Sequence, residues 1–276
     1  MRTTLLTIGT AIALTSAPMA QTGEDAVRRC HAYAASQSAD PGRSIAGCTS
    51  VIESARSSRD QKLDALAVRG ALFRRTGRFD LAIVDLTEVL RHRAGADAAY
   101  VERGMAYVAS KESDLAMADF NDAILLNANN RVAFSQRANL YRAQGLYDEA
   151  IRDLNQAVAL DPNDPWAVSE RGLDHLSKAE FEAAIHDFDR ALELTPTSAW
   201  TFAERGAAYL RLGKFDRAIA DLSRALELDD GDAWSLYARG VARRNAGDAA
   251  GADRDVAAAT RLWPNVAAAA VRDGIR

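Results

Sequence analysis

The chain repeats one pattern every 34 residues, and this periodicity limits what it can fold into more than any other feature. Six copies align without a gap on one small residue, which is Gly70, Gly104, Ala138, Gly172, Gly206 and Gly240. A short helical unit cannot bury its apolar face alone, so self-similarity at this period predicts a solenoid of stacked units. The function of such a chain is expected to lie in a surface that meets a partner.

The copy over residues 199–232 shows what one repeat contains. Its pattern predicts a helix from about Trp200 to Leu212 and a second helix from about Asp216 to Leu228. Gly213 separates them, and glycine accepts the left-handed conformation that commonly ends a helix. Apolar residues of the second helix recur at the three-and-four spacing of one helical face. The chain is therefore predicted to be all-α, with a helical hairpin as its unit.

At these positions the chain resembles the tetratricopeptide repeat family. The resemblance rests on a small residue and an aromatic residue in the first helix, an alanine and a large apolar residue in the second, and a closing proline in several copies. In the copy above these are Gly206, Tyr209, Ala218 and Leu222, and the preceding copy closes with Pro196. The resemblance implies a right-handed α-solenoid of helix-turn-helix repeats that binds protein partners. The chain departs from the family in three ways. Arginine replaces the usual leucine before the small residue, Lys111 and Ala179 replace the turn glycine, and Ala94, Ala128 and Asp230 replace the closing proline.

The two ends of the chain differ from the repeats. Residues 1–20 combine Arg2, an apolar run from Leu5 to Leu14 and a small-residue stretch ending at Ala20, which predicts a cleaved secretory signal peptide. An uncleaved N-terminal helix is the alternative. We divide the rest into a degenerate helical hairpin over 21–62, six repeats over 63–266 and a capping helix over 267–276. The segment Ile45–Ser54 resembles exported bacterial repeat proteins, so we expect an exported protein, periplasmic if bacterial, without a membrane span.

Two cysteines, Cys30 and Cys48, lie in this N-terminal hairpin. Its helices are expected from about Gly23 to Ser36 and from about Ser44 to Ser54, with Pro41 in the turn. Two cysteines in an exported chain indicate a disulfide. A reactive thiol or a metal-binding pair is the alternative, which the lack of a CxxC spacing disfavours.

An arginine precedes each of the six small residues, and an aspartate follows each of them by fifteen residues. The arginines are Arg69, Arg103, Arg137, Arg171, Arg205 and Arg239, and the aspartates are Asp85, Asp119, Asp153, Asp187, Asp221 and Asp255. Folding each hairpin at its turn sets the arginine level with its aspartate, which favours a bidentate ion pair that holds the repeats together. An anion-binding stripe is the alternative, and it requires unpaired arginines.

A shorter ladder consists of Trp166, Trp200 and Trp234, again 34 residues apart. The family resemblance implies that this helix position lines the concave groove. The same register assigns further residues to the groove, namely Ser169, Leu173, Tyr237, Arg211, Arg244, Asn139 and Arg142. Such an aromatic and apolar groove with arginines suits an extended peptide or a partner helix. Packing of each tryptophan on the loop before it is the alternative.

The composition argues against several classes of function. The chain has 34 basic and 38 acidic residues and a net charge of −4, which disfavours nucleic-acid binding. The four histidines show no metal-binding spacing, and no nucleotide or hydrolase motif occurs, so we expect no enzyme, metal or cofactor. The expected function is a protein-binding scaffold or adaptor in the cell envelope. Self-assembly into a homo-oligomer and carbohydrate or peptidoglycan binding through the tryptophans are the alternatives.

Overall fold

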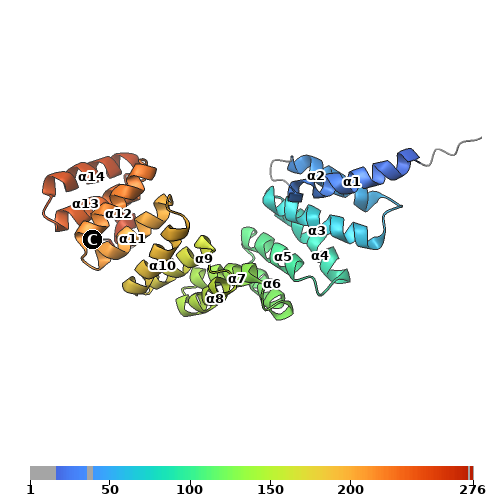
Figure 1. The fold of residues 1–276 in the computed structure, drawn as a ribbon, viewed down its shortest axis with the longest axis horizontal. Coiled ribbons are helices and arrows are strands. Elements are labelled where there is room, and N and C mark those ends of the chain that lie inside the picture. The colour runs from blue at the N-terminus through green and yellow to red at the C-terminus, as the bar shows by residue number, and fades with distance from the viewer. Residues whose placement is uncertain (1–16, 36–39, 273, 276) are drawn as a thin grey trace, which may run out of the picture. The chain divides into compact units, whose positions relative to one another are not determined.

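The fold is all-α, as predicted. A computed structural model describes residues 17–35, 40–272 and 274–275, which form fifteen helices and no strand (Figure 1). Within these residues, no helix is both long and apolar enough to cross a membrane. Contacts along the chain divide it into a first unit of residues 1–122 and a second unit of residues 123–276. The division falls inside α6 (Ser113–Leu126).

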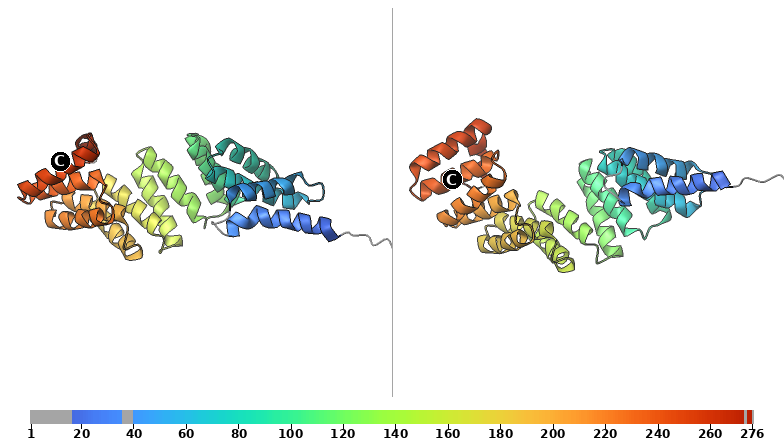
Figure 2. Two further views of the ribbon diagram at one scale, coloured as in Figure 1. Left: turned by 90° about the horizontal axis from the view of Figure 1, so that it is seen from above. Right: turned by 45° about the horizontal axis from the view of Figure 1, so that its top comes forward.

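The first unit is built from helical hairpins packed in chain order. Its helices before α6 are α1 (Ala17–Ala35), α2 (Pro41–Glu53), α3 (Arg59–Arg75), α4 (Phe79–His92) and α5 (Asp97–Ala109). Helix α1 packs on α2 and α3 packs on α4, while α2 contacts α3 and α4 contacts α5, as the views in Figure 2 show. The hairpin is therefore the unit of packing, and each hairpin buries its apolar face against the next.

The first hairpin starts earlier than the sequence pattern predicted. Helix α1 begins at Ala17, not Gly23, and α2 begins at Pro41, not Ser44. The Asp40 side chain accepts the Gly42 N–H at 2.9 Å and caps α2. Proline is well suited to the first helical position, where its missing N–H costs nothing, so Pro41 opens the helix and does not lie in the turn. Most of the predicted signal peptide, residues 1–16, lies outside the described residues.

The second unit continues the same architecture from α7 onward. Its helices are α7 (Arg131–Ala143), α8 (Tyr147–Leu160), α9 (Pro165–Ser177), α10 (Phe181–Leu194), α11 (Ala199–Arg211), α12 (Phe215–Leu228), α13 (Ala233–Asn245), α14 (Ala249–Leu262) and α15 (Val266–Arg272). The hairpins α9–α10, α11–α12 and α13–α14 follow one another along the unit (Figure 1). The second helix of each hairpin packs on the first helix of the next, and α15 packs on α13 and α14.

The repeated small residue marks the closest approach of the two helices in a hairpin. Leu222 of α12 is fully buried beneath Gly206 of α11, where an added Cβ would lie 2.8 Å from the leucine Cγ. Gly172 and Phe188 show the same relationship, with 2.9 Å between an added Cβ and the ring. Side chains in a close-packed core do not tolerate such contacts. The need for this approach explains why a small residue returns every 34 positions.

The turn inside each of the six 34-residue repeats has one residue in the left-handed conformation. In the turn after α11 this residue is Gly213, with φ of 70°. Lys111 and Ala179 hold the same place in their turns, with φ of 64° and 60°. The hydrogen bonds of these turns match as well. After α11 the Lys214 N–H donates to the Tyr209 carbonyl at 2.9 Å, and after α9 the Glu180 N–H donates to the His175 carbonyl at 2.9 Å. The turns at Lys111 and Ala179 thus retain their geometry with side chains that the left-handed region disfavours.

Candidate partner-binding groove

The arginines before the small residues hold their aspartates by two hydrogen bonds. In α11, Arg205 donates from Nε and Nη2 to the two carboxylate oxygens of Asp221, at 2.7 Å each. The other five pairs repeat this geometry, with distances from 2.6 to 2.9 Å. The hydrogen bonds that Arg205 donates to Asp221 raise the pKa of Arg205. Because these arginines are all engaged with buried carboxylates, they do not form an anion-binding stripe.

The remaining guanidinium nitrogen reaches the preceding repeat. Arg205 donates from Nη1 to Asp189 of α10 at 2.6 Å, and Arg239 donates from Nη1 to Ser223 of α12 at 3.2 Å. Further acceptors of this kind are Thr49, Thr87 and Asn155. Each of these arginines therefore links two helices of its own hairpin to one helix of the hairpin before. Sequence reasoning missed these acceptors, although Thr87, Asn155, Asp189 and Ser223 all stand sixteen residues before their arginines.

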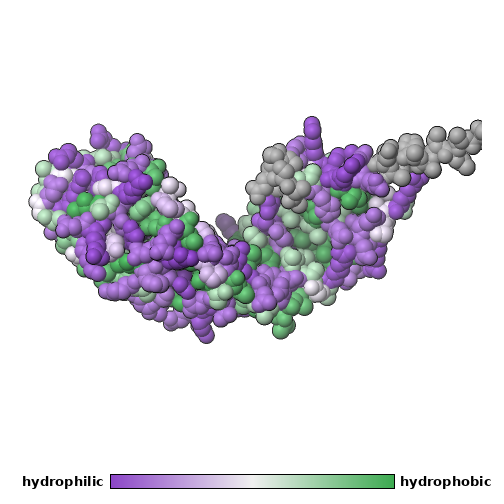
Figure 3. Space-filling model, in the orientation of Figure 1, coloured by the Kyte–Doolittle hydropathy of each residue, from purple (hydrophilic) through white to green (hydrophobic). Residues whose placement is uncertain are grey.

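The second unit contains a pocket of about 770 Å³, which we call the groove pocket. Its apolar wall comes from Leu173 and Leu176 of α9 and from Ala203 and Ala207 of α11. Its other lining residues are Tyr147, Ser177, Ala199, Trp200, Glu204, Arg211, Asp229, Asp232, Trp234, Arg272 and Gly274. A concavity of this volume that joins an apolar wall to polar and charged groups can accept a ligand. On the face seen in Figure 3, hydrophobic residues form small separate patches, so the pocket is the better guide to a binding site.

The three tryptophans of the ladder do not share one environment. Trp200 lines the groove pocket, is 44% exposed, and meets the Phe188 ring edge-on with 6.5 Å between centroids. Trp234 also lines the pocket but is half-buried against the core cluster that contains Tyr209. Trp166 is 40% exposed and lies outside the pocket lining. Trp200 is thus held by its contact with Phe188 and still exposes part of its ring at the groove pocket, so it is the tryptophan of the three best placed to contact a partner.

Several residues that the register assigned to the groove are used inside the fold. Ser169 is buried and donates its hydroxyl to the Pro165 carbonyl at 2.7 Å, because serine in a helix can bond to the carbonyl four residues earlier. Tyr237 is half-buried against two core clusters. Arg244 is exposed and pairs with Asp253 at 2.6 Å. Only Leu173 and Arg211 of the non-tryptophan predictions line the groove pocket.

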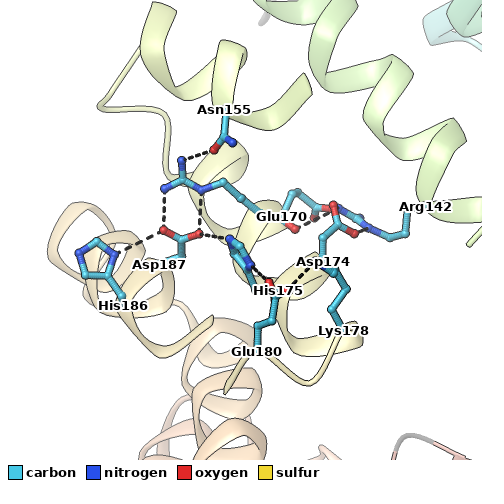
Figure 4. A network of polar contacts seen from close by, with 10 residues as sticks. Arg142, Asn155, Glu170, Asp174, His175, Lys178, Glu180, His186 and Asp187 are labelled. Atoms are coloured by element: carbon cyan, nitrogen blue, oxygen red, sulfur yellow. Dashed lines mark hydrogen bonds and ion pairs between the residues drawn. The ribbon is translucent and has the colours of Figure 1, made fainter. Parts of the chain in front are cut away.

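Arg142, another predicted groove residue, joins α7 to α9 (Figure 4). It forms ion pairs with Glu170 and Asp174, and its Nη1 lies 3.5 Å from the Asn139 Oδ1. Burial lowers the pKa of Arg142, but its hydrogen bond to Asp174 and its attraction to Glu170 outweigh that effect and raise it. Burial raises the pKa of Asp174 as well, against the opposing effect of Arg142. Arg142 is therefore engaged within the chain by two carboxylates.

His175 replaces a core aromatic residue and sits in a network of polar groups (Figure 4). Its Nδ1 lies 2.7 Å from Glu180, and its Nε2 lies 4.0 Å from Asp187. Lys178 contacts Glu180 at 2.5 Å and Asp148 at 2.7 Å. The hydrogen bond from Lys178 and that from His175 lower the pKa of Glu180. This network stabilises the turn between α9 and α10, where Ala179 has its positive φ.

The remaining sites named from the sequence are structural. Cys30 and Cys48 form a disulfide and are fully buried between α1 and α2. Among the residues whose placement is described, no group of three or more His, Cys, Asp and Glu side chains could hold a metal ion. The groove pocket is thus the feature of the second unit with the geometry of a binding site.

Comparison with known proteins agrees with this architecture. Residues 97–130 and 199–232 match models described as tetratricopeptide repeat, and residues 138–178 match one described as TPR repeat. No curated protein matches the chain.

Solved structures with a similar fold have low sequence identity. The pilF protein of Pseudomonas aeruginosa is 20% identical, covers 75% of this chain and 94% of its own, and has a TM-score of 0.66. A tetratricopeptide repeat protein from Parabacteroides merdae is 17% identical over 88% of this chain and 94% of its own, with a TM-score of 0.64. YrrB, described as a TPR protein with an unusual peptide-binding site, is 19% identical over 68% of this chain and 97% of its own, with a TM-score of 0.59.

At such identities the likeness concerns the fold, which is of the protein–protein interaction scaffold type. The six-fold register, the hairpin packing and the three repeat matches lead to one conclusion: the chain belongs to the tetratricopeptide repeat family.

Proposed function

We propose that this protein is a non-enzymatic scaffold that binds an extended segment of a protein partner in the groove pocket. The observation that carries the proposal is the position of Trp200, a 44% exposed indole at the edge of an apolar wall formed by α9 and α11. Tryptophan is a preferred anchor at protein interfaces because its large rigid surface gains much when a partner covers it. The wall beside it supplies space for apolar side chains of the partner.

The lining of the pocket favours a peptide over a small rigid ligand. The apolar wall runs across α9 and α11, and charged groups stand at both of its ends, with Asp232 at one and Arg211 at the other. An extended peptide offers apolar side chains and polar groups in alternation, which matches such a lining.

The proposed place of action is outside the cytoplasm, as an adaptor in the cell envelope if the source is bacterial. Residues 1–20 have the composition of a secretory signal, and disulfides such as Cys30–Cys48 persist in oxidising compartments. Cell fractionation of the full chain tests this, beside a variant with charged residues in the Leu5–Leu14 run. Retention of both forms in the cytoplasm would contradict export.

Crosslinking in cells tests the proposed site. Wild type is compared with Trp200→Ala, and Trp263→Ala is the matched control because Trp263 is 41% exposed and lies outside the groove pocket. We expect a crosslinked protein partner that is lost in Trp200→Ala and kept in Trp263→Ala, with crosslinks that map to Ser177 or Ala199 at the pocket. A partner kept equally in both variants would move recognition to another surface.

The same variants distinguish the alternatives. Binding to purified cell wall that depends on Trp200 would assign the site to carbohydrate in place of protein. A mass from light scattering that rises with concentration in wild type, and not in Trp200→Ala, would assign it to a second copy of the chain.

A further inference from the structure

Two arginines border the groove pocket on the same side. Arg211 is the last residue of α11, and its guanidinium carbon lies 4.7 Å from the centre of the Phe181 ring. Arg272 is the last residue of α15. The chain after α15 brings Gly274 against Arg211, since an added Cβ on Gly274 would lie 3.1 Å from the Arg211 Cζ. Arg211 and the segment that carries Arg272 and Gly274 therefore meet at one end of the pocket.

The segment that carries Gly274 is held firmly. The Ile275 N–H donates to the Ala270 carbonyl at 2.9 Å, and Gly274 adopts the positive φ of 79° that such a helix ending requires. Ile275 is 1% exposed and belongs to the core cluster that contains Leu210. Arg272 thus stands at the pocket on an anchored segment.

Neither arginine has a carboxylate partner within the part of the chain that the structure describes. Two arginines one register position earlier are paired, with Arg74 bound to Glu102 at 2.6 Å and Arg244 to Asp253 at 2.6 Å. Within the described residues, Arg211 contacts the face of the Phe181 ring, which attracts a cation without neutralising it. A half-buried guanidinium in this state can gain a charge-assisted hydrogen bond from a bound carboxylate.

The carboxylates of the same pocket are already used by the fold. Asp232 accepts the Trp234 N–H at 3.0 Å and caps α13, and Asp229 accepts the Gly231 N–H at 3.1 Å. Glu204 also has a polar partner within the chain. Helix α11 has 13 residues, so the acidic and tryptophan end of the pocket lies roughly 15–20 Å from Arg211. Asp229 and Asp232 are therefore well separated from Arg211.

We propose that Arg211 and Arg272 bind the side-chain carboxylate of an aspartate or glutamate in the partner segment. This proposal rests on the proposed function, because the same pocket holds the rest of that segment. Apolar residues of the same segment lie on Leu173 and Leu176, and residues about five positions from the acidic one reach Trp200. The site differs from a clamp for a chain terminus, since one acidic side chain within a continuous peptide satisfies it.

A blocked peptide library tests the proposal directly. The probe is a set of N-acetylated, C-amidated hexapeptides in which one position is Glu, Gln or Lys and the others are mixtures of Ala, Leu, Gly and Ser. Blocked ends leave the fixed residue as the only charge. The full chain is immobilised, and retained peptides are measured by mass spectrometry. We expect wild type to retain the Glu peptides about tenfold better than the Gln peptides, a preference that falls as salt is added.

The variants separate charge recognition from groove binding. Arg211→Gln combined with Arg272→Gln is expected to lose the Glu preference while retaining the Gln peptides. Arg217→Gln is the matched control, because its guanidinium also lies on an aromatic ring, at 5.6 Å from the Tyr209 centre, outside the groove pocket. Thermal unfolding of each variant verifies that it is folded.

Two results would overturn the proposal. One is a Glu preference that survives in the double variant. The other is retention by wild type without any Glu preference; if that retention still depends on Trp200, the proposed function stands and only the role of the arginines is lost. Retention of no peptide of any kind by wild type would count against both.

Discussion

The guanidinium of Arg205 donates to Asp189 of the preceding repeat at 2.6 Å while its other nitrogens hold Asp221 of its own repeat. The two carboxylates differ in burial, since the Asp189 side chain is 50% exposed and the Asp221 side chain is 10% exposed. One arginine thus makes a water-facing and a buried ion pair at once, and the two should contribute differently to stability.

Asp221→Ala should lower the free energy of unfolding by about 2–4 kcal/mol, because it leaves the half-buried Arg205 charge without its two-point partner. Asp189→Ala should cost about 1 kcal/mol or less, as is usual for exposed pairs. Urea unfolding followed by circular dichroism measures both. Equal losses from the two variants would show that burial does not decide the strength of these pairs.

Lys111→Gly and Ala179→Gly should each stabilise the chain. Both residues hold a positive φ that costs a side chain about 1 kcal/mol or more, and glycine relieves that strain at a smaller cost in the entropy of the unfolded chain. The expected net gain is about 0.5–1 kcal/mol each, measured by urea unfolding. Gly213→Ala is the reverse control and should destabilise by a similar amount. A loss of stability in both glycine variants would contradict this explanation of the turns.

Removal of the disulfide should loosen the first hairpin and leave the last repeats unchanged. Cys30 and Cys48 are 18 residues apart in sequence, and closing a loop of this size contributes about 3 kcal/mol in the chain-entropy model. Hydrogen exchange of the Cys30→Ser, Cys48→Ser variant should therefore be faster in α2. Exchange in α12 is the internal control. Unchanged protection of α2 would mean that packing alone holds the hairpin.

The contribution of Glu180 to stability should depend on pH. Its pKa in the folded chain lies below the ordinary value of 4.5, because Lys178 and then His175 donate hydrogen bonds to it. A lowered pKa in the folded state stabilises the fold fully above pH 4.5, and the stabilisation is lost as the pH falls through the lowered pKa. The melting temperatures of wild type and Glu180→Gln should thus differ at neutral pH and converge in acid. A difference that grows on acidification would contradict the assignment.

The sequence predicts what happens inside one repeat better than what happens between repeats. The spacing of Arg205 and Asp221 places them at one height of a single hairpin, and the apolar spacing together with Gly213 predicts the two helices and the turn. The contacts of Arg205 with Asp189 and of Arg142 with Glu170 and Asp174 depend on how one hairpin is set against the next. The pattern within one copy does not determine that placement.

Local chemistry accounts for the other differences. Ser169 is polar and occupies a position that the family resemblance assigns to the groove, yet its hydroxyl is satisfied by its own helix and the residue is buried. Pro41 was expected in a turn because proline often marks one, but Asp40 before it is a good N-cap and the pair starts a helix. Arg272 and Gly274 line the groove pocket, but the repeat pattern could not predict this because both residues follow the last copy.

The bond from each arginine to the repeat before it also bears on how this chain can change in length. Asp189 and Arg205 are sixteen residues apart, as are Ser223 and Arg239. Excision of residues 199–232 would place Arg239 sixteen residues after Asp189, so that it would take over the acceptor that Arg205 uses, and it would keep Asp255 as its own partner. Loss of this copy therefore leaves Arg239 with both kinds of partner. The arginine contacts between repeats make the 34-residue copy the natural unit in which such a protein can become longer or shorter.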